Sequence, residues 1–260
     1  MKKETLTPIA KSTLRIYVCT SSFTLKLPWR SAPVLNNLKR FALGLLLLAP
    51  MLSAAGSANA LSDQRELLER SRLTFLKLID HPDFPELKQY VHHAKAILII
   101  PALIKGGFFI GGEGGSGILI ARLPQGGWGY PAFYTLGAGS IGLQFGGQVG
   151  EVVFTIMTEN GLKAVLSNQV KLGVDASIAL GPLGKGVEAS TTTNFSSDIY
   201  QFAKTEGLFG GGAFEGALVY KRDDWNQGFY GRAVTPQQIV LGNEVSNTAA
   251  EPLRQALSTY

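Results

Sequence analysis

The sequence predicts an α+β fold: a single domain with a glycine-rich, strongly bent antiparallel sheet, barrel-like or a sandwich, an N-terminal amphipathic helix and C-terminal helices. Three observations support this prediction. Within residues 105–151, 16 of the chain's 31 glycines are interleaved with β-forming residues such as Phe108, Ile118 and Phe145. Residues 62–80 repeat apolar side chains at helical spacing ahead of that stretch. The C-terminal part returns to helical patterns, and no linker or break in composition separates these regions.

The glycines of residues 105–151 need a physical reason, because glycine inside a strand weakens it. The usual reasons are a bulge, a sharp bend, or the close approach of another backbone or of a ligand. We therefore expect a tightly coiled sheet in which some backbone stays open beside apolar rings. The expected strands are residues 96–100, 107–112, 116–123, 130–137, 140–149, 151–158, 170–180, 187–194 and 207–220, with a short further segment at 197–202.

Residues 62–80 are expected to form the N-terminal helix. Ser62 is a good N-cap, acidic residues occupy the first turn, and Leu68, Phe75 and Ile79 fall on one side. This apolar side can dock on the sheet, or it can lie on a membrane surface. Acidic residues dilute the positive charge of the polar side, which favours docking.

Four shorter segments also have helical patterns. Proline in the stretch after residue 80 ends the N-terminal helix, and Thr235-Pro236 is a typical helix start because proline suits the first helical position. The expected helices are residues 86–94, 160–169, 236–241 and a last one from Ser246 or Asn247 to 257.

Residues 1–60 have the features of an export signal with a long basic region. Lys39 and Arg40 precede a short apolar run, and Ala58-Asn59-Ala60 forms a small-residue cleavage site. The apolar run is shorter than the roughly 20 residues that a membrane-spanning helix needs. We therefore expect an exported protein, periplasmic or secreted and peripherally associated with a membrane, whose folded domain comprises residues 61–260.

Removing the expected leader changes the charge. The whole chain has a net charge of +5, but residues 1–60 hold eight of the basic residues and one acidic residue, so residues 61–260 carry about −2. This balance argues against a nucleic-acid partner, which requires clustered positive charge. The single cysteine, Cys19, lies within the leader, so we expect no disulfide, no catalytic thiol and no lipidated cysteine.

No motif predicts an enzyme, a cofactor or a metal. Residues 137–142 match the glycine pattern of dinucleotide-binding proteins, but the sequence after them does not predict the required helix. The three histidines, His81, His92 and His93, have no cysteine or spacing that would complete a metal site. The nucleophile motif of serine hydrolases is absent from the sequence. We therefore predict a protein without catalytic residues.

Two features fit a lipid surface as well as an ordinary structural role. The loop at residues 181–186 presents glycines and Lys185, which can hold a phosphate or simply form a hairpin turn. Trp128 and Trp225 lie in glycine-flanked turns, where an aromatic ring can enter a lipid interface or cap the core.

Four segments, in order, resemble the SYLF domain, also called the lipid-binding or actin-binding domain of yeast endocytic proteins. They are residues 105–122, 128–151, 181–186 and 200–216, within a likeness that covers roughly residues 87–257. The resemblance implies binding of membrane lipids, notably phosphoinositides in eukaryotic members, through a basic surface and an amphipathic N-terminal helix. Some members also bind actin filaments.

The resemblance places Lys105 and Lys185 at basic positions of the family and residues 62–80 at its N-terminal helix. We expect an exported, non-enzymatic protein whose partner is phospholipid or a membrane surface, not nucleic acid. The export signal and the slightly acidic charge of residues 61–260 argue against actin, and a protein partner stays open. Phosphate contacts are expected from Lys105, Lys185, Arg122, Lys221 and Arg222, and membrane contacts from Phe75, Trp128 and Trp225. The alternative is a periplasmic structural or protein-interaction module that pairs with a partner through its sheet edges.

Overall fold

The chain divides into two compact units, Met1–Ala54 and Ala55–Tyr260. In the first unit, the computed structural model describes the antiparallel pair β1 (Ile16–Val18) and β2 (Ser21–Phe23). The rest of the expected leader lies outside the described residues. In the second unit, the structure describes residues 61–107, 110–141, 148–182, 196–206 and 214–260.

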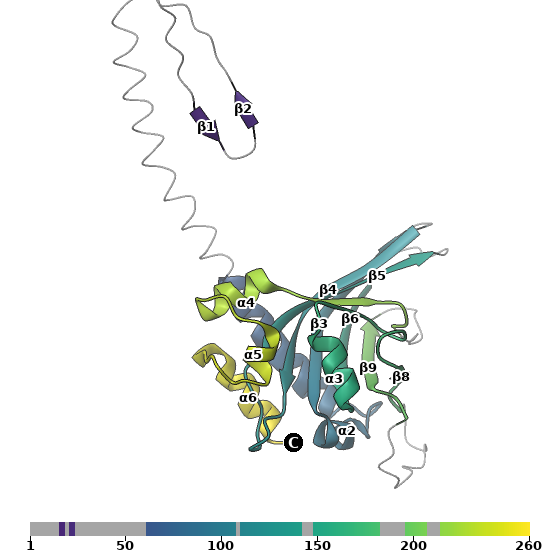
Figure 1. The fold of residues 1–260 in the computed structure, drawn as a ribbon. Helices are drawn as coiled ribbons and strands as arrows, with labels where there is room; N and C mark the ends of the chain where they lie inside the picture. Colours follow the sequence, from purple (N-terminus) through teal and green to yellow (C-terminus); the bar gives the residue numbers. More distant parts are fainter. Residues whose placement is uncertain are drawn as a thin grey trace, which may run out of the picture. The chain divides into compact units, whose positions relative to one another are not determined.

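The second unit is built on a curled sheet with eight strands in its described residues (Figure 1). The strand order is β7-β10-β5-β4-β3-β6-β9-β8, and all neighbours are antiparallel except β8 and β9. This arrangement confirms the predicted α+β class and bent antiparallel sheet. The strands are β3 (Ala96–Gly107), β4 (Ile110–Ala121), β5 (Ala132–Ile141), β6 (Gln148–Ile156), β7 (Gln169–Lys171), β8 (Ile178–Leu180), β9 (Ile199–Glu206) and β10 (Leu218–Lys221).

Several strand boundaries differ from those expected. The strands expected at 107–112 and 116–123 form the single strand β4, because β3 and β5 pair with it along both sides. The strand expected at 170–180 is instead two short strands, separated by a turn in which Gly173 has a φ of +80°. Residues 187–194 lie outside the described residues.

Strand β3 continues beyond the expected end at Ile100 by passing through a bulge. Its register with β4 and with β6 shifts by one residue around Pro101 and Ala102. Proline has no N–H to donate to a ladder, so inside a central strand it is tolerated at a bulge. The bulge therefore lets β3 cross the whole sheet despite its proline.

The bulge explains two of the glycines in β4. A Cβ atom added to Gly115 would lie 2.5 Å from the carbonyl oxygen of Ala102. One added to Gly117 would lie 2.3 Å from Cδ1 of Ile100 and 2.5 Å from the carbonyl oxygen of Ile99. All three distances are too short for real atoms. These glycines are therefore required by the close approach of a neighbouring backbone, one of the expected reasons.

Helices pack on both faces of the sheet. The N-terminal helix (helical residues 61–79), α2 (Leu87–His93), α4 (Asp223–Tyr230) and α6 (Glu251–Ser258) cover one face. Helices α3 (Glu159–Leu166) and α5 (Pro236–Val240) cover the other. Alternate residues of β3 enter the two cores, which explains its continuous apolar run. In Figure 1, α3 crosses the near face and the blue N-terminal helix lies behind the strands.

The N-terminal helix docks on the sheet, as the charge pattern favoured. Phe75, Leu78 and Ile79 are buried in the core of its face. The rings of Phe75 and Tyr260, which follows α6, pack edge to face with their centroids 5.8 Å apart. The burial of Phe75 corrects its predicted membrane contact, because a ring in the core does not reach a lipid surface.

Helix α4 replaces the turn that was expected around Trp225. Asp223 and Asp224 occupy its first turn, where they complement the partial positive charge of a helix N-terminus. Gly231 ends the helix at a φ of +70°, the conformation that glycine favours. The first turn of α4 thereby places Trp225 above the sheet.

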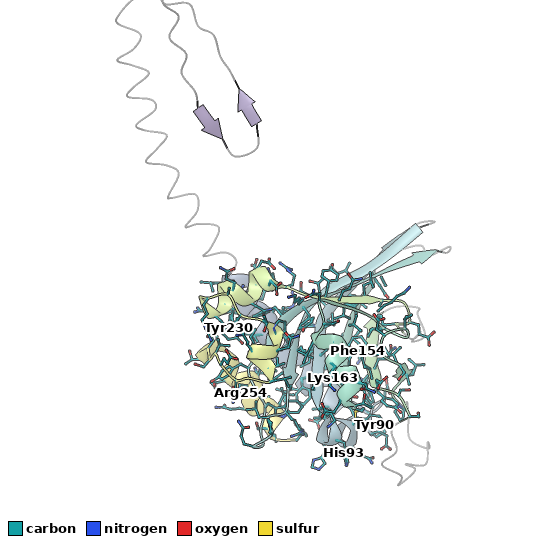
Figure 2. The ribbon with its side chains drawn as sticks, viewed as in Figure 1. Tyr90, His93, Phe154, Lys163, Tyr230 and Arg254 are labelled. Atoms are coloured by element: carbon teal, nitrogen blue, oxygen red, sulfur yellow. The ribbon has the colours of Figure 1, made fainter. Side chains whose placement is uncertain are left out.

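Arg254 and Tyr230, both labelled in Figure 2, tie the C-terminal helices to the loop between β4 and β5. Nε of Arg254 donates to the carbonyl oxygens of Trp128 and Gly129 at 3.0 and 3.1 Å. The Tyr230 hydroxyl donates to the carbonyl oxygen of Pro131 at 2.6 Å. These bonds fix α4 and α6 against one end of the sheet. None of the helices in the described residues is both long enough and apolar enough to span a bilayer.

Candidate functional site

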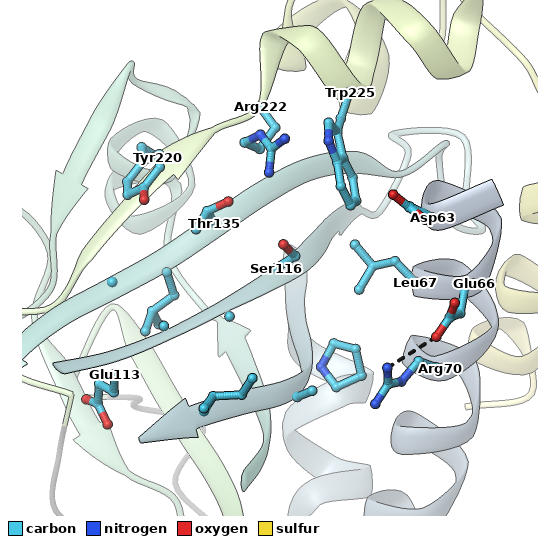
Figure 3. A pocket seen from close by; sticks show the side chains of 17 residues that line it. Asp63, Glu66, Leu67, Arg70, Glu113, Ser116, Thr135, Tyr220, Arg222 and Trp225 are labelled. Atoms are coloured by element: carbon cyan, nitrogen blue, oxygen red, sulfur yellow. Dashed lines mark hydrogen bonds and ion pairs between the residues drawn. The ribbon is translucent and has the colours of Figure 1, made fainter. Parts of the chain in front are cut away.

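An open groove of about 680 Å³ lies where the first turns of the N-terminal helix meet the sheet (Figure 3). Its floor comes from the glycine-rich parts of β4 and β5, one wall from the N-terminal helix, and the other wall from β10 and the start of α4. In Figure 1, the glycine-rich ends of the long central strands project beyond the helical layers. The groove therefore combines segments that are far apart in the sequence.

Small residues form the floor. Gly114 pairs with Gly137, and Ser116 pairs with Thr135, across β4 and β5. These positions continue the helix-covered face of the sheet, but their side chains are too small to fill the space beside the N-terminal helix. The floor is therefore mostly backbone and hydroxyl groups.

The helical wall carries charge of both signs. Asp63, Glu66, Leu67 and Arg70 share one side of the helix, as the helical spacing requires. Arg70 pairs with Glu66 at 3.3 Å, and both side chains are exposed. In the part of the chain that the structure describes, the exposed Asp63 carboxylate has no ion pair. Figure 3 shows it directed towards Trp225.

The opposite wall is preorganised by Arg222. Its Nε and Nη2 donate to the two carboxylate oxygens of Asp224 at 3.0 and 2.8 Å. This pair holds the pKa of Asp224 below its usual value. The guanidinium also lies 4.5 Å from the centroid of the Trp225 ring, whose other contacts include Phe133 at 5.8 Å. A polar and an aromatic group are thus held together at the groove.

An apolar surface borders the open end of the groove. Ile104 lines the groove and is 62 % exposed, and Val149, its partner across β3 and β6, is 52 % exposed. We refer to Ile104 and Val149 as the apolar shelf. Tyr220, also at the groove, is 39 % exposed. Large apolar side chains left in water beside a polar groove are typical of an interaction surface.

The structure brings together two of the predicted site residues, Arg222 and Trp225. Lys221 precedes them and pairs with Asp223 at 3.0 Å. The backbone of Lys105 pairs with that of Glu113 in β4, but the Lys105 side chain lies outside the described part of the structure. Lys185 lies outside the described residues altogether. The predicted phosphate contacts of these two lysines remain predictions.

Arg122 and Trp128 lie at the other end of β4, about 20 Å from Ser116 at the rise per residue of a strand. The Trp128 ring is buried. The Arg122 guanidinium packs over it and donates to the carbonyl oxygen of Val91 at 3.1 Å. Burial lowers the pKa of Arg122. These two residues cap the core, which corrects their predicted phosphate and membrane contacts.

The acidic residues of the groove and Tyr220 were not among the site residues predicted from the sequence. Asp63 was interpreted as a first-turn residue, and Tyr220 as part of a strand. Their proximity depends on the bend of the sheet and on α4, neither of which local spacing specifies. The available signal was the run of small residues at 114–117, which marks a surface that side chains do not fill.

The described residues contain no group of three or more histidine, cysteine, aspartate or glutamate side chains placed to hold a metal ion. The glycine pattern at residues 137–142 begins inside β5, which runs on to Ile141. The strand therefore continues through positions where a dinucleotide motif would begin its helix.

Comparison with known proteins identifies relatives over much of the chain. Residues 137–260 match the family model described as "Ysc84: Las17-binding protein actin regulator". The chain is 32 % identical to protein YSC84 of Saccharomyces cerevisiae over 169 residues, which are 64 % of this chain and 36 % of that protein. It is 30 % identical to the human SH3 domain-containing YSC84-like protein 1 over 168 residues, 64 % of this chain and 49 % of that one.

The protein of the same name from Xenopus laevis is 31 % identical over 165 residues, 63 % of this chain and 49 % of the relative. The chain therefore spans about a third to a half of the length of these relatives. The range matched by the family model includes Tyr220, Arg222 and Trp225 but not the N-terminal helix. One wall of the groove thus lies within the matched range and the other outside it.

Proposed function

Because the chain carries a domain of the Ysc84/SYLF family, we propose that it binds phospholipid, with the headgroup in the groove between the N-terminal helix and the start of α4. The family is described as an actin regulator and not as a family of enzymes. Its members are of an actin-binding or lipid-binding type. The proposed activity is therefore binding without catalysis.

One observation carries the proposal: a polar groove opens beside the apolar shelf. A lipid presents a charged headgroup next to hydrocarbon, and the groove and the shelf offer the matching surfaces in the same order. Removing an aliphatic side chain fully from water is worth roughly 1.5–3 kcal/mol, so shelf residues that enter the interface would stabilise the complex.

Charge attraction to an acidic bilayer contributes little in this proposal. An unpaired basic residue near such a surface contributes about 1 kcal/mol. Arg70 and Arg222 in the groove wall are each already paired with a carboxylate. Binding therefore depends on the fit of the headgroup and on the shelf more than on net charge.

We also propose that the protein is exported and acts in the periplasm or outside the cell, peripherally attached to a membrane. The support is the basic, apolar and small-residue pattern of residues 1–60. The mass of the protein purified from the exported fraction of cells that express the full sequence tests this: cleavage after Ala60 leaves Leu61 as the first residue. An intact N-terminus in that fraction would contradict it.

A protein partner is the second candidate, because relatives are described as Las17-binding or as containing SH3 domains. Binding of a protein partner by strand pairing at a sheet edge has less support than binding at another surface. The edge strands of the described sheet, β7 and β8, have three residues each, and short edges offer little to a partner strand.

Two measurements test phospholipid binding. Lipid extracted with organic solvent from the purified full-length protein should contain phospholipid, identified by mass spectrometry. The protein should also co-sediment with vesicles made from mixtures of phosphatidylethanolamine, phosphatidylglycerol and phosphatidylcholine. A protein that carries no lipid and stays in the supernatant with every mixture, yet captures a protein partner, would favour the second candidate.

A further inference from the structure

We propose that the groove selects phospholipids with an ethanolamine headgroup, a phosphate joined to a primary ammonium, over acidic phospholipids. This inference rests on the proposed function and specifies the lipid class. Its basis is the distribution of charge: each guanidinium of the groove wall is already matched to a carboxylate, and one carboxylate, that of Asp63, has no ion pair among the described residues.

Arg222 is suited to hold the phosphate. Its Nε and Nη2 are used by Asp224, which fixes the guanidinium in place. A guanidinium has five N–H donors, so three remain available to phosphate oxygens, two on Nη1 and one on Nη2.

Asp63 is suited to hold the ammonium. Its exposed carboxylate faces the Trp225 ring from the helical wall, while Arg222 packs on the same ring from the opposite wall (Figure 3). A guanidinium and a carboxylate thus flank one indole ring. In the ethanolamine headgroup, a short ethylene linker joins the ammonium to the phosphate. The ammonium can therefore face Asp63 while the phosphate faces Arg222.

An acidic headgroup lacks this match. Phosphatidylglycerol would place hydroxyl groups, and no cation, beside Asp63 and the paired Glu66. The Asp63 carboxylate would then have no cation to pair with, although the phosphate near it carries a charge of the same sign. Like charges brought together at a partly buried site cost free energy, so the acidic lipid should bind more weakly.

Choline is also a poorer ligand for this groove. Its quaternary ammonium has no N–H to donate to a carboxylate, and such groups are recognised by the faces of aromatic rings. Arg222 already covers one face of Trp225. The primary ammonium, which can donate to the Asp63 carboxylate, therefore fits the charges better.

The apolar shelf favours a lipid over a free headgroup. Ile104 lines the open end of the groove, and Val149 lies beside it. A soluble phosphoethanolamine compound would leave these side chains in water. The lipid should therefore bind at least about tenfold more tightly than glycerophosphoethanolamine, which carries the same charges without the acyl chains.

The test compares the full-length protein on three kinds of vesicle: phosphatidylcholine alone, and phosphatidylcholine mixed equally with phosphatidylethanolamine or with phosphatidylglycerol. We expect about tenfold tighter binding to the ethanolamine mixture, the size expected for one charge-assisted hydrogen bond. Asp63→Asn should remove this preference. The matched control is Glu69→Gln on the same helix, an exposed carboxylate paired with Arg72 outside the groove, which should keep the preference.

Equal binding to all three vesicles, stronger binding to phosphatidylglycerol, or a preference that survives Asp63→Asn would overturn the inference and leave phospholipid binding intact. Absence of binding to every vesicle would remove both proposals. Glycerophosphoethanolamine should compete at high concentration, whereas glycerophosphoglycerol should not. If the free headgroup binds as tightly as the lipid, the ligand is a soluble compound and the proposed lipid selectivity fails.

Discussion

The Arg122 guanidinium lies 4.5 Å from the centroid of the Trp128 ring and donates to the carbonyl oxygen of Val91. One contact joins it to the loop after β4 and the other to α2. A desolvated cation–π contact is worth up to about 2 kcal/mol, and a hydrogen bond from a charged donor adds to it. Arg122 therefore connects two parts of the core.

We predict that Arg122→Ala lowers the free energy of unfolding by about 2–3 kcal/mol and leaves vesicle binding by the folded protein unchanged. Urea unfolding followed by tryptophan fluorescence measures the first effect, and co-sedimentation measures the second. Arg65→Ala, on the exposed side of the N-terminal helix, is the control and should change neither. Loss of vesicle binding at full stability would instead restore Arg122 as a lipid contact.

Gly117 is predicted to be the least replaceable glycine of β4. The added Cβ of Gly117→Ala would collide with Ile100 and with the backbone oxygen of Ile99, which belongs to a central strand and cannot easily move. We expect a loss of stability of about 1–3 kcal/mol, the usual cost of overpacking. The unfolding midpoint in urea gives the measurement.

Gly139→Ala in β5 is the matched control for Gly117. Nothing lies within 4 Å of a Cβ added there, and the position is exposed. This variant should be neutral or slightly stabilising, because alanine has less freedom to lose on folding. Equal losses at both positions would show that the bulge is not what excludes a side chain at Gly117.

Composition and periodicity were sufficient to predict the bent sheet, the docked N-terminal helix and the buried start of β3. These features depend on local patterns: an apolar stripe ending at Ile79, or a run of apolar residues from 96 to 100. The path of β3 through Pro101 could not be predicted from such local patterns. A proline ends most strands, and only the pairing with β4 and β6 shows the bulge that accommodates it.

The candidate site was predicted in part. Arg222 and Trp225 were identified, but as members of a turn, because the acidic pair at 223–224 was not interpreted as the start of a helix. Arg122 and Trp128 were assigned to a lipid surface on residue type alone. Residue type does not distinguish a cation that packs on a buried ring from one that faces solvent, so this part required the structure.

Asp198 is predicted to make stability depend on acid pH. Its carboxylate accepts hydrogen bonds from the hydroxyls of Thr158 and Ser177 and from the backbone N–H of Ser177. These bonds, that of Thr158 foremost, lower its pKa below the usual value. A carboxyl with a lowered folded-state pKa stabilises the fold above its unfolded-state pKa, about 3.9, and loses that contribution as the pH falls below it.

Stability measured in urea should therefore decrease between pH 5 and the acid range, about pH 3, and the decrease should be smaller in Asp198→Asn. The variant should also be less stable than the natural protein at pH 7, by about 1–3 kcal/mol, because the amide accepts these bonds less well. Asp175→Asn, an exposed aspartate in the nearby turn after β7, serves as the comparison. An unchanged pH dependence in Asp198→Asn would assign the acid sensitivity to other carboxylates.

The last prediction concerns the apolar shelf. About half of Ile104 and Val149 is still exposed, so each has roughly 1 kcal/mol to gain by entering a lipid interface. The double variant Ile104→Ser, Val149→Ser should therefore bind vesicles about 30-fold more weakly, with little change in stability because both side chains already contact water. Leu241→Ser, similarly exposed at the end of α5 on the other face, is the control. Equal vesicle binding by the natural protein, the double variant and Leu241→Ser would show that the shelf does not touch the membrane. If the double variant also still captures a protein partner, the shelf has no role in that interaction either.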